Sequence, residues 1–411
     1  MVERPPHYGD RISVDQQEGG GSPTVIYPGN GVAVSVLVIA ALFVLTQLYA
    51  AIPLLGPVGI SMEADATFAL STCFSVTYAV GFLIWGPISD RYGRKKVMTA
   101  SIGVLAVVTL LCSGASSLPI LAGLRALQGA AASGFAPVAL AYLTEAVAPR
   151  WRARAIGAMS AAFLVAGIFG QVLASTIALR ASWSWFFVVC GVVLAMIFTI
   201  ILFSVVEVPN HTPSMTLLQQ FGNLVVFLFR PAIVLLGIAH IALLLSFVAL
   251  YTGIGHHLED LHVAASNIIL IRLAALPAMF ISLGVGALAE RIGAIRVAQV
   301  GFGLAAVGML GEAFTDQTIF DVVASSVVYV SGVALSIPSM IMLYGETAAP
   351  HRGSGMAING FVLFIGASIG ALVGKAIGGF GTLTLTLVAL LVIAASSLLT
   401  LGTILRKDSS S

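Results

Sequence analysis

Long apolar segments alternate with short polar ones along the chain. A bilayer-spanning helix needs about 20 apolar residues. Apolar runs of about this length predict twelve spans. They cover 32–56, 66–89, 97–115, 118–144, 155–179, 183–206, 231–255, 264–289, 297–314, 320–345, 354–379 and 381–405. These runs are continuous and about twice as long as a barrel strand. They predict an all-α membrane protein and exclude a transmembrane β-barrel.

A polar stretch separates the spans into two sets of six. We expect a flexible cytosolic tail over 1–31, an N-terminal bundle over 32–206 and a cytosolic linker over 207–223. A C-terminal bundle follows over 224–405, and 406–411 form a second cytosolic tail.

Composition supports a membrane protein. Of the 411 residues, 59% are hydrophobic and only 9% are charged, with a mean hydropathy of +1.05. Soluble domains carry about 25% charged residues, so a soluble enzyme is excluded. The formal net charge of +2 is too balanced to indicate a nucleic-acid partner.

Basic residues are distributed unevenly between the two ends of the spans. Arg180 and Lys375 fall on one side, Arg125 and Arg272 fall inside spans, and all other Lys and Arg residues fall on the opposite side. Because basic residues near span ends stay in the cytosol, both termini are expected to be cytosolic. This predicts a multi-pass protein of the cell (inner) membrane.

A loop after the second span is repeated after the eighth. The first copy reads GPISDRYGRKKV from Gly86, and the second reads GALAERIGAIRV from Gly286. An acidic residue, an arginine and a glycine recur in both copies. They are Asp90, Arg91 and Gly93, and Glu290, Arg291 and Gly293. A later repeat relates Glu145 to Glu346. The repeats predict two pseudo-symmetric six-helix bundles with the same orientation in the membrane.

At these residues the chain resembles the major facilitator superfamily. The family signature between helices 2 and 3, G-x-L-A-D-R-x-G-R-K, is matched by Gly86, Asp90, Arg91, Gly93, Arg94 and Lys95, with Ile88 in place of leucine. Its helix 4 pattern R-x-x-Q-G is matched by Arg125, Gln128 and Gly129. The resemblance covers residues 32 to 405 and implies the twelve-helix fold of that family, with no covalent chemistry and no cofactor.

The resemblance implies a secondary transporter that works by alternating access, in which the repeated loops stabilise the outward-open state. In the family the loop acid meets the dipole of a helix in the other half, and a following arginine pairs with an acid at the end of helix 4, here Glu145. The alternative is that the basic residues only anchor the loops in the cytosol. The expected conformational switch comprises Gly86, Asp90, Arg91, Gly93, Arg94, Glu145, Glu290, Arg291 and Glu346.

Within the family, the chain most resembles the twelve-helix drug and metabolite exporters. This implies efflux of a small organic solute by a monomer, with protons as a candidate coupling ion. Gly157, Gly167 and Gly170 miss the glycine spacing of the helix 5 antiporter motif, which weighs against proton antiport.

Buried arginines favour a different substrate. An arginine at the bilayer centre costs roughly 2.5 to 3.5 kcal/mol, so Arg125 and Arg272 should face protein or water. Each could line the substrate cavity. For Arg125 the family resemblance suggests a conformational or proton-coupling role, and the alternative is a structural bond to backbone carbonyls. Arg272 could instead snorkel outward. An arginine-bearing cavity attracts anions, so uptake or exchange of an organic anion is the alternative function. No carboxylate is expected deep in a span. The other candidate substrate-binding residues are Gln47, Tyr49, Tyr78, His240, Asn359 and Phe364.

Two further features have competing explanations. Small residues recur every four positions in helices 5 and 11, either for static packing or as surfaces on which the halves pivot. The outer loop over 255–262 concentrates possible metal ligands, but a solvated polar loop explains it better, so no metal is expected. Its candidate ligands are His256, His257, Glu259, Asp260 and His262. A membrane metalloenzyme and a nontransporting receptor are the alternatives from other functional classes.

Overall fold

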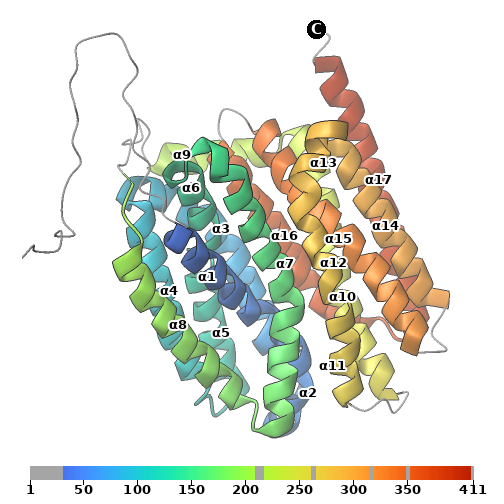
Figure 1. The fold of residues 1–411 in the computed structure, drawn as a ribbon. Coiled ribbons are helices and arrows are strands. Elements are labelled where there is room, and N and C mark those ends of the chain that lie inside the picture. The colour runs from blue at the N-terminus through green and yellow to red at the C-terminus, as the bar shows by residue number, and fades with distance from the viewer. Residues whose placement is uncertain (1–30, 209–216, 261–264, 315–318, 349–351, 409–411) are drawn as a thin grey trace, which may run out of the picture.

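A computed structural model describes the chain except for residues 1–30, 209–216, 261–264, 315–318, 349–351 and 409–411. The predicted tail 1–31 thus lies almost wholly outside the described residues. Within them, 12 helices are long and apolar enough to cross a membrane. They stand side by side in one helical bundle (Figure 1). The predicted all-α fold with twelve spans is confirmed.

The first six spans follow the predicted boundaries closely. They are formed by α1 (Gly31–Tyr49), the π-helix η1 (Phe68–Thr72) with α3 (Cys73–Tyr92), α4 (Arg94–Cys112), α5 (Leu118–Ala132) with α6 (Ala136–Ala146), α7 (Pro149–Arg180) and α8 (Ser184–Ser204). A shorter apolar helix, α2 (Ala51–Met62), follows α1.

The other six spans repeat this arrangement. They are formed by α10 (Pro231–Asp260), by α11 (Ala265–Ala274), α12 (Leu276–Met279), the 3-10 helix η2 (Phe280–Gly284) and α13 (Val285–Ile292) together, and by α14 (Ala294–Phe314), α15 (Ile319–Thr347), α16 (Arg352–Ala376) and α17 (Phe380–Asp408). The eighth span is interrupted next to Pro277, which has no N–H to continue the helical ladder.

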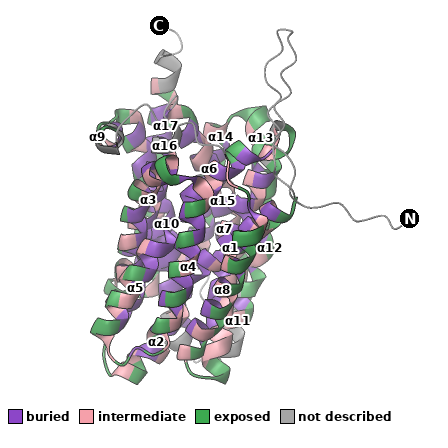
Figure 2. Cartoon of the chain, turned by 90° about the vertical axis from the view of Figure 1, so that its left-hand side faces the viewer, coloured by how far each residue is buried: buried purple, intermediate pink, exposed green. Residues whose placement is uncertain are grey.

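The predicted linker contains a helix, α9 (Leu217–Leu228). Leu224 and Phe227 are buried, whereas Val225, Val226 and Phe229 are exposed. An amphipathic helix of this kind suits the membrane interface. It packs against α3 and α16 at one end of the bundle (Figure 2). The expected end of the linker at residue 223 therefore falls inside a helix.

The bundle has two ends, which carry different turns. The loop face is the end that carries Gly93 and Gly293, which join α3 to α4 and α13 to α14. The opposite face carries the turn between α2 and η1. Helices of the two predicted halves meet mainly where α3 packs on α16 and where α7 packs on α11, α12 and η2.

The glycine stripe of the eleventh span packs within its own half. A Cβ atom added at Gly370 would lie 2.6 Å from the carbonyl oxygen of Leu245, and one added at Gly374 would lie 2.7 Å from that of Ala249. Both carbonyls belong to α10. The stripe therefore permits close contact between α10 and α16, which is the static-packing explanation.

Candidate functional site

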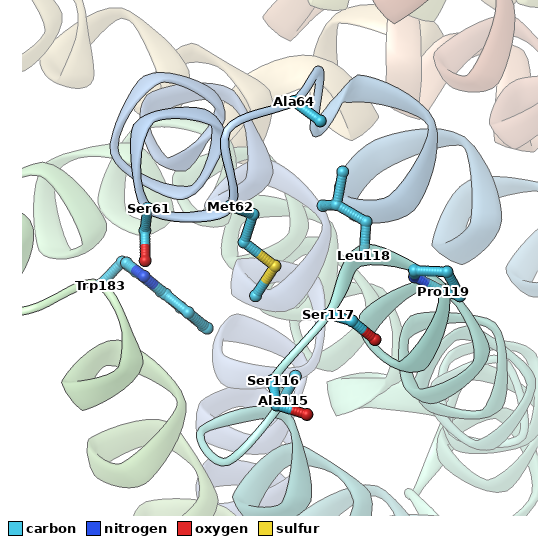
Figure 3. A pocket seen from close by; sticks show the side chains of 9 residues that line it. All are labelled: Ser61, Met62, Ala64, Ala115, Ser116, Ser117, Leu118, Pro119 and Trp183. Carbon is cyan, nitrogen blue, oxygen red and sulfur yellow. The ribbon is translucent and has the colours of Figure 1, made fainter.

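A pocket of about 500 Å³ opens at the opposite face (Figure 3). Its lining comes from the end of α2, the turn between α4 and α5, and the residue before α8. The lining residues are Ser61, Met62, Ala64, Ala115, Ser116, Ser117, Leu118, Pro119 and Trp183. All belong to the N half, and none is a predicted site residue. A path that alternates between the two faces needs walls from both halves, so this pocket is not our candidate site.

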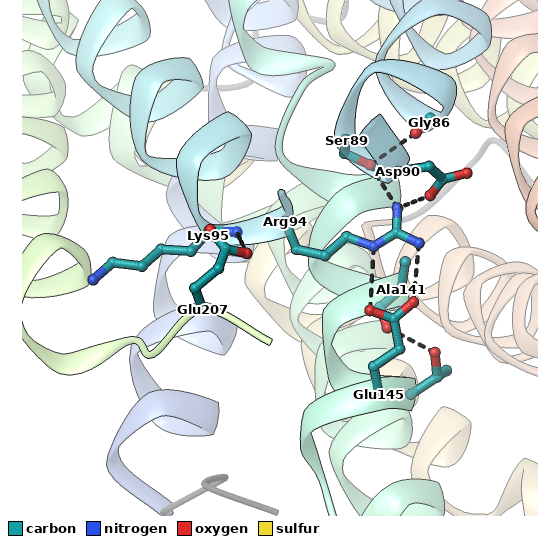
Figure 4. A network of polar contacts seen from close by, with 9 residues as sticks. Gly86, Ser89, Asp90, Arg94, Lys95, Ala141, Glu145 and Glu207 are labelled. Carbon is teal, nitrogen blue, oxygen red and sulfur yellow. Dashed lines mark hydrogen bonds and ion pairs between the residues drawn. The ribbon is translucent and has the colours of Figure 1, made fainter. Parts of the chain in front are cut away.

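Arg94 joins two carboxylates at the loop face (Figure 4). Its guanidinium pairs with Asp90 on α3 and donates to Glu145 on α6, from Nε at 3.3 Å and from Nη2 at 2.9 Å. Nη1 also donates to Ser89 Oγ at 2.6 Å. Such two-pronged, charge-assisted contacts fix geometry well. The acid is the predicted Glu145, while the neighbouring Arg91 is exposed.

Glu207 holds the same loop from the other side. It follows α8, and its carboxylate accepts hydrogen bonds from the backbone N–H groups of Lys95 at 3.0 Å and Lys96 at 3.2 Å. A carboxylate at a helix N-terminus satisfies free donors and complements the helix dipole. Glu207 is not among the residues predicted from the sequence, although an acid that directly follows the sixth span, on a face rich in basic residues, is a detectable signal.

The C-half loop has the same backbone but not the same contacts. Gly293 has φ of 88°, close to the 105° of Gly93. Glu290, Arg291 and Glu346 are exposed. The position that corresponds to Arg94 is Ala294, whose side chain cannot join two carboxylates. The two loops therefore share a turn, and the arginine bridge belongs to the N half.

Arg125 is enclosed in the N half, with 1% of its surface exposed. It donates to the carbonyl oxygens of Leu70 at 2.8 Å and Gln47 at 2.9 Å, and to Gln128 Oε1 at 2.5 Å. Its guanidinium also lies 4.4 Å from the centre of the Phe74 ring. Leu70 lies in η1, and Gln47 lies just before the break between α1 and α2. The Leu70 carbonyl thus comes from a π-helical segment, where the backbone ladder is perturbed, and the Gln47 carbonyl comes from the last turn of α1.

These contacts bear on the two explanations that the sequence leaves open for Arg125, a place in the substrate cavity and a bond to backbone carbonyls. Protein groups engage all three of its guanidinium nitrogens. The side chain of Gln47 is also buried and accepts a hydrogen bond from Gln128 at 3.1 Å. In this conformation, the carbonyl-binding explanation describes Arg125. Arg272 lies on α11, and its side chain lies outside the described residues.

Aromatic side chains meet between the two halves. Tyr78 on α3 contacts Phe364 on α16 edge-on, with ring centres 4.3 Å apart, and Phe82 lies 5.4 Å from the same ring. Tyr49 of the N half contacts Phe247 on α10, with ring centres 5.7 Å apart. We call these five residues the aromatic seam. Three of them, Tyr49, Tyr78 and Phe364, are predicted site residues that the structure brings to the boundary between the halves.

The aromatic seam lies near the middle of the spans. Tyr78 is ten residues into the span Phe68–Tyr92, about 15 Å from its outer end at 1.5 Å per residue. Its hydroxyl oxygen is buried and has no hydrogen-bond partner. Mid-depth positions between two repeats are where transporters of this architecture hold their substrates.

A polar cluster lies beside the aromatic seam in the C half. His240 on α10, Tyr344 on α15 and Asn359 on α16 are all buried. The rings of His240 and Tyr344 have centres 5.8 Å apart, and Asn359 lies beside His240. Both nitrogens of His240, the Tyr344 hydroxyl and Asn359 Oδ1 lack well-formed hydrogen bonds. Gly360, next to Asn359, packs on Phe82 and connects the polar cluster to the seam.

An ion pair joins the halves at the opposite face. Lys375 on α16 pairs with Asp65, which lies between α2 and η1. The Lys375 ammonium group holds the pKa of the Asp65 carboxyl at about 2, below its ordinary value. Both side chains are half exposed, at 47% for Lys375 and 56% for Asp65. The pair therefore connects the halves through a solvated contact.

The possible metal ligands of the outer loop are only partly described. His257 stacks on Phe380 with ring centres 4.5 Å apart, which is a packing contact rather than a ligand arrangement. His262 lies outside the described residues, and no group of three candidate ligands gathers among those described.

Comparisons with known proteins agree with this architecture. A sequence model of the Major Facilitator Superfamily matches residues 34–371. An uncharacterised transporter of Buchnera aphidicola from Schizaphis graminum is 26% identical over 308 residues, covering 74% of each chain. The inner membrane transport protein YnfM of Escherichia coli is 26% identical over 234 residues, covering 56% of each.

A solved structure shares the fold. The human organic anion transporter MFSD10 superposes with a TM-score of 0.70 at 15% identity, covering 89% of this chain and 99% of that one. At this identity the likeness concerns the fold alone. With the match to the family model, these findings show that the chain belongs to the major facilitator superfamily and is a multi-pass membrane transporter.

Proposed function

We propose that this protein exports a small organic solute across the cell membrane by alternating access, and that the solute binds between the aromatic seam and the polar cluster. One observation carries the proposal: buried polar atoms that lack well-formed hydrogen bonds lie next to aromatic rings where the two halves meet. A buried polar group without a hydrogen bond costs about 1–3 kcal/mol. A bound solute that offers donors and acceptors would remove that cost.

The chemistry of these residues favours an uncharged solute. His240, Tyr344, Asn359 and Tyr78 offer hydrogen bonds, and the rings of the seam offer an apolar surface. The enclosed Arg125 directs a hydrogen bond from each of its guanidinium nitrogens to a protein group, which leaves it poorly placed to meet a substrate anion. A flat or partly aromatic molecule with amide, hydroxyl or ring-nitrogen groups suits this arrangement.

The geometry supports rocking of the two halves. Each half supplies one wall of the aromatic seam, so a single chain holds a complete site and a monomer is the proposed working unit. The excess of basic residues at the loop face supports placing that face and both termini in the cytosol. Export is proposed from the resemblance to drug and metabolite exporters.

Counterflow in proteoliposomes tests the proposal. A panel of neutral polar aromatics, organic anions and organic cations is offered, and we expect uptake of members of the first group. Preference for an anion over its neutral analogue would support the alternative function. Everted vesicles should accumulate the solute and right-side-out vesicles should not; the reverse result would contradict export.

Removing single tyrosine hydroxyls and measuring the apparent affinity for the solute tests where the solute binds. Removing one hydrogen bond to the solute costs about 1 kcal/mol, so Tyr344→Phe should weaken apparent affinity roughly fivefold. Tyr329→Phe is the matched control, because its buried hydroxyl bonds Ser246 at 2.9 Å and lies outside the polar cluster. Equal affinities in wild type and Tyr344→Phe would place the solute elsewhere.

A further inference from the structure

Glu312 is a buried carboxyl at the end of a membrane span. It lies on α14 two residues before the last residue, Phe314, and only 1% of its surface is exposed. Both carboxyl oxygens lack a hydrogen-bond partner. The sequence places Glu312, like the other acidic residues, at a span end rather than deep in a span. The structure encloses it.

Close helix packing encloses this carboxyl. Gly308 and Gly311 of α14 face α15, and a Cβ atom at either position would overlap Tyr329 or Ser325. The backbones of α14 and α15 therefore lie very close together along the helical turn that precedes Glu312. Little space is left for water between α14 and α15 at this end.

Among the described residues, the helices packed on α14 supply no lysine or arginine to this end. Helix α15 brings Asp321 and Tyr329, and α17 has no titratable residue between Phe380 and Ile404. Helix α10, which packs on α15 and α17, carries Tyr251 and also His257, whose ring stacks on Phe380. The hydroxyl of Tyr329 bonds Ser246, and that of Tyr251 lies 3.4 Å from Ser326 Oγ.

The other charges of these helices lie at the far end. On α14 itself the basic residue is Arg296, sixteen residues away, or about 24 Å along the axis. Helix α13 carries Glu290 and Arg291, also at the loop face. Among the described residues, an ionised Glu312 would therefore have no lysine or arginine within reach.

A buried carboxylate without a partner pays a large desolvation penalty, which protonation removes. We propose that Glu312 is a proton-binding site that keeps its proton at neutral pH and exchanges it with water at the opposite face. The end of α14 is only about 3 Å further along the helix axis, so the path to water is short.

The N half shows why this site is particular to the C half. Cys112 occupies the corresponding position, 200 residues earlier, and its Sγ lies 3.9 Å from Gln128 Oε1. That position therefore holds a small side chain inside a satisfied network. This proposal concerns proton binding and does not depend on the identity or direction of the transported solute.

Infrared spectroscopy of the full-length protein in lipid tests the proposal. The wild type should show a protonated-carboxyl C=O band at pH 7 that disappears in Glu312→Gln. Glu63→Gln is the matched control, because Glu63 is exposed at the same face, and it should keep the band. Absence of a Glu312-dependent band at pH 7 would overturn the proposal, whatever the counterflow assay reports.

Thermal unfolding supplies a second readout. The native state would bind one proton more than the unfolded state, in which Glu312 meets water, so raising the pH should lower the melting temperature of the wild type relative to Glu312→Gln. Parallel melting curves would contradict proton binding. If Glu312→Gln fails to fold, Glu312→Asp should shift the infrared band, and an unshifted band would assign it to another carboxyl.

Discussion

The two repeated loops of the loop face share a backbone and differ in what holds them. In the N half, Arg94 joins Asp90 to Glu145, while Glu207 caps α4 and would lie 2.8 Å from a Cβ atom at Gly93. In the C half, Ala294 replaces the arginine, and a Cβ atom at Gly293 would meet nothing within 4 Å. The repeat preserves the turn, and among the described residues of the two loops the ionic contacts belong to the N half.

The interiors of the halves differ in the same sense. All three guanidinium nitrogens of Arg125 in the N half donate hydrogen bonds, whereas the carboxyl oxygens of Glu312 in the C half have no partner. The predictions below test this asymmetry, from the largest expected effect to the smallest.

Replacing Arg125 should have the largest effect. Arg125→Ala leaves the carbonyls of Gln47 and Leu70 and the amide of Gln128 without their donor, which should cost about 3–5 kcal/mol and lower the melting temperature. Arg180→Ala is the control, because Arg180 is exposed, and it should unfold like the wild type. A stable Arg125→Ala protein that no longer binds solute would restore the cavity role that its sequence predicts.

Breaking the arginine bridge should come second. Arg94→Ala releases both carboxylates and should cost about 1.5–3 kcal/mol, the usual range for hydrogen bonds to charged groups. It should also change the transport rate and the balance of conformers measured by spin-label distances across the loop face. Asp90→Ala should act in the same direction without abolishing solute affinity. Unchanged rates and distances in both variants would contradict a switching role.

The cap of α4 should contribute less. Glu207→Gln keeps the shape of the side chain and removes its charge, so the expected loss of stability is about 1 kcal/mol. The matched variant in the other half is Glu290→Gln, which alters an exposed side chain and should change the melting temperature little. Equal losses in the two variants would contradict the asymmetry between the loops.

The ion pair at the opposite face should have the smallest effect, because exposed pairs contribute little. Lys375 holds the pKa of Asp65 at about 2, so the carboxyl stays ionised above that range. The contribution of the pair is therefore present at neutral pH and disappears only as the pH falls toward 2. Spin labels can be placed on α2, which precedes Asp65, and on α16, which carries Lys375. The distance between them should shift in Asp65→Asn at both pH 5 and pH 8. A shift confined to one pH would contradict this.

Sequence periodicity predicted much of the fold. The expected span 231–255 coincides with the span Pro231–Gly255, because a run of apolar residues bounded by polar ones carries its own signal. Helix α9 escaped this reading because a short amphipathic segment in a polar linker lacks the length of a span.

The candidate site was only partly predictable. Tyr78 and Phe364 stand out as aromatic residues at mid-span, and Glu145 as an acid near the loop. The partner of Phe364 depends on how α16 meets α3, and burial of Glu312 depends on how closely α14 approaches α15. Such contacts join residues far apart in the chain, so local patterns do not report them.

By itself the sequence determined the twelve spans, the repeated loops and the membership of a transporter family, because hydrophobic length and glycine turns are local properties. Only the tertiary structure decided that Arg125 is enclosed, that Glu207 caps α4 and that Glu312 has no partner. Whether a polar side chain inside the membrane meets a carbonyl, a carboxylate or nothing depends on which helices pack around it.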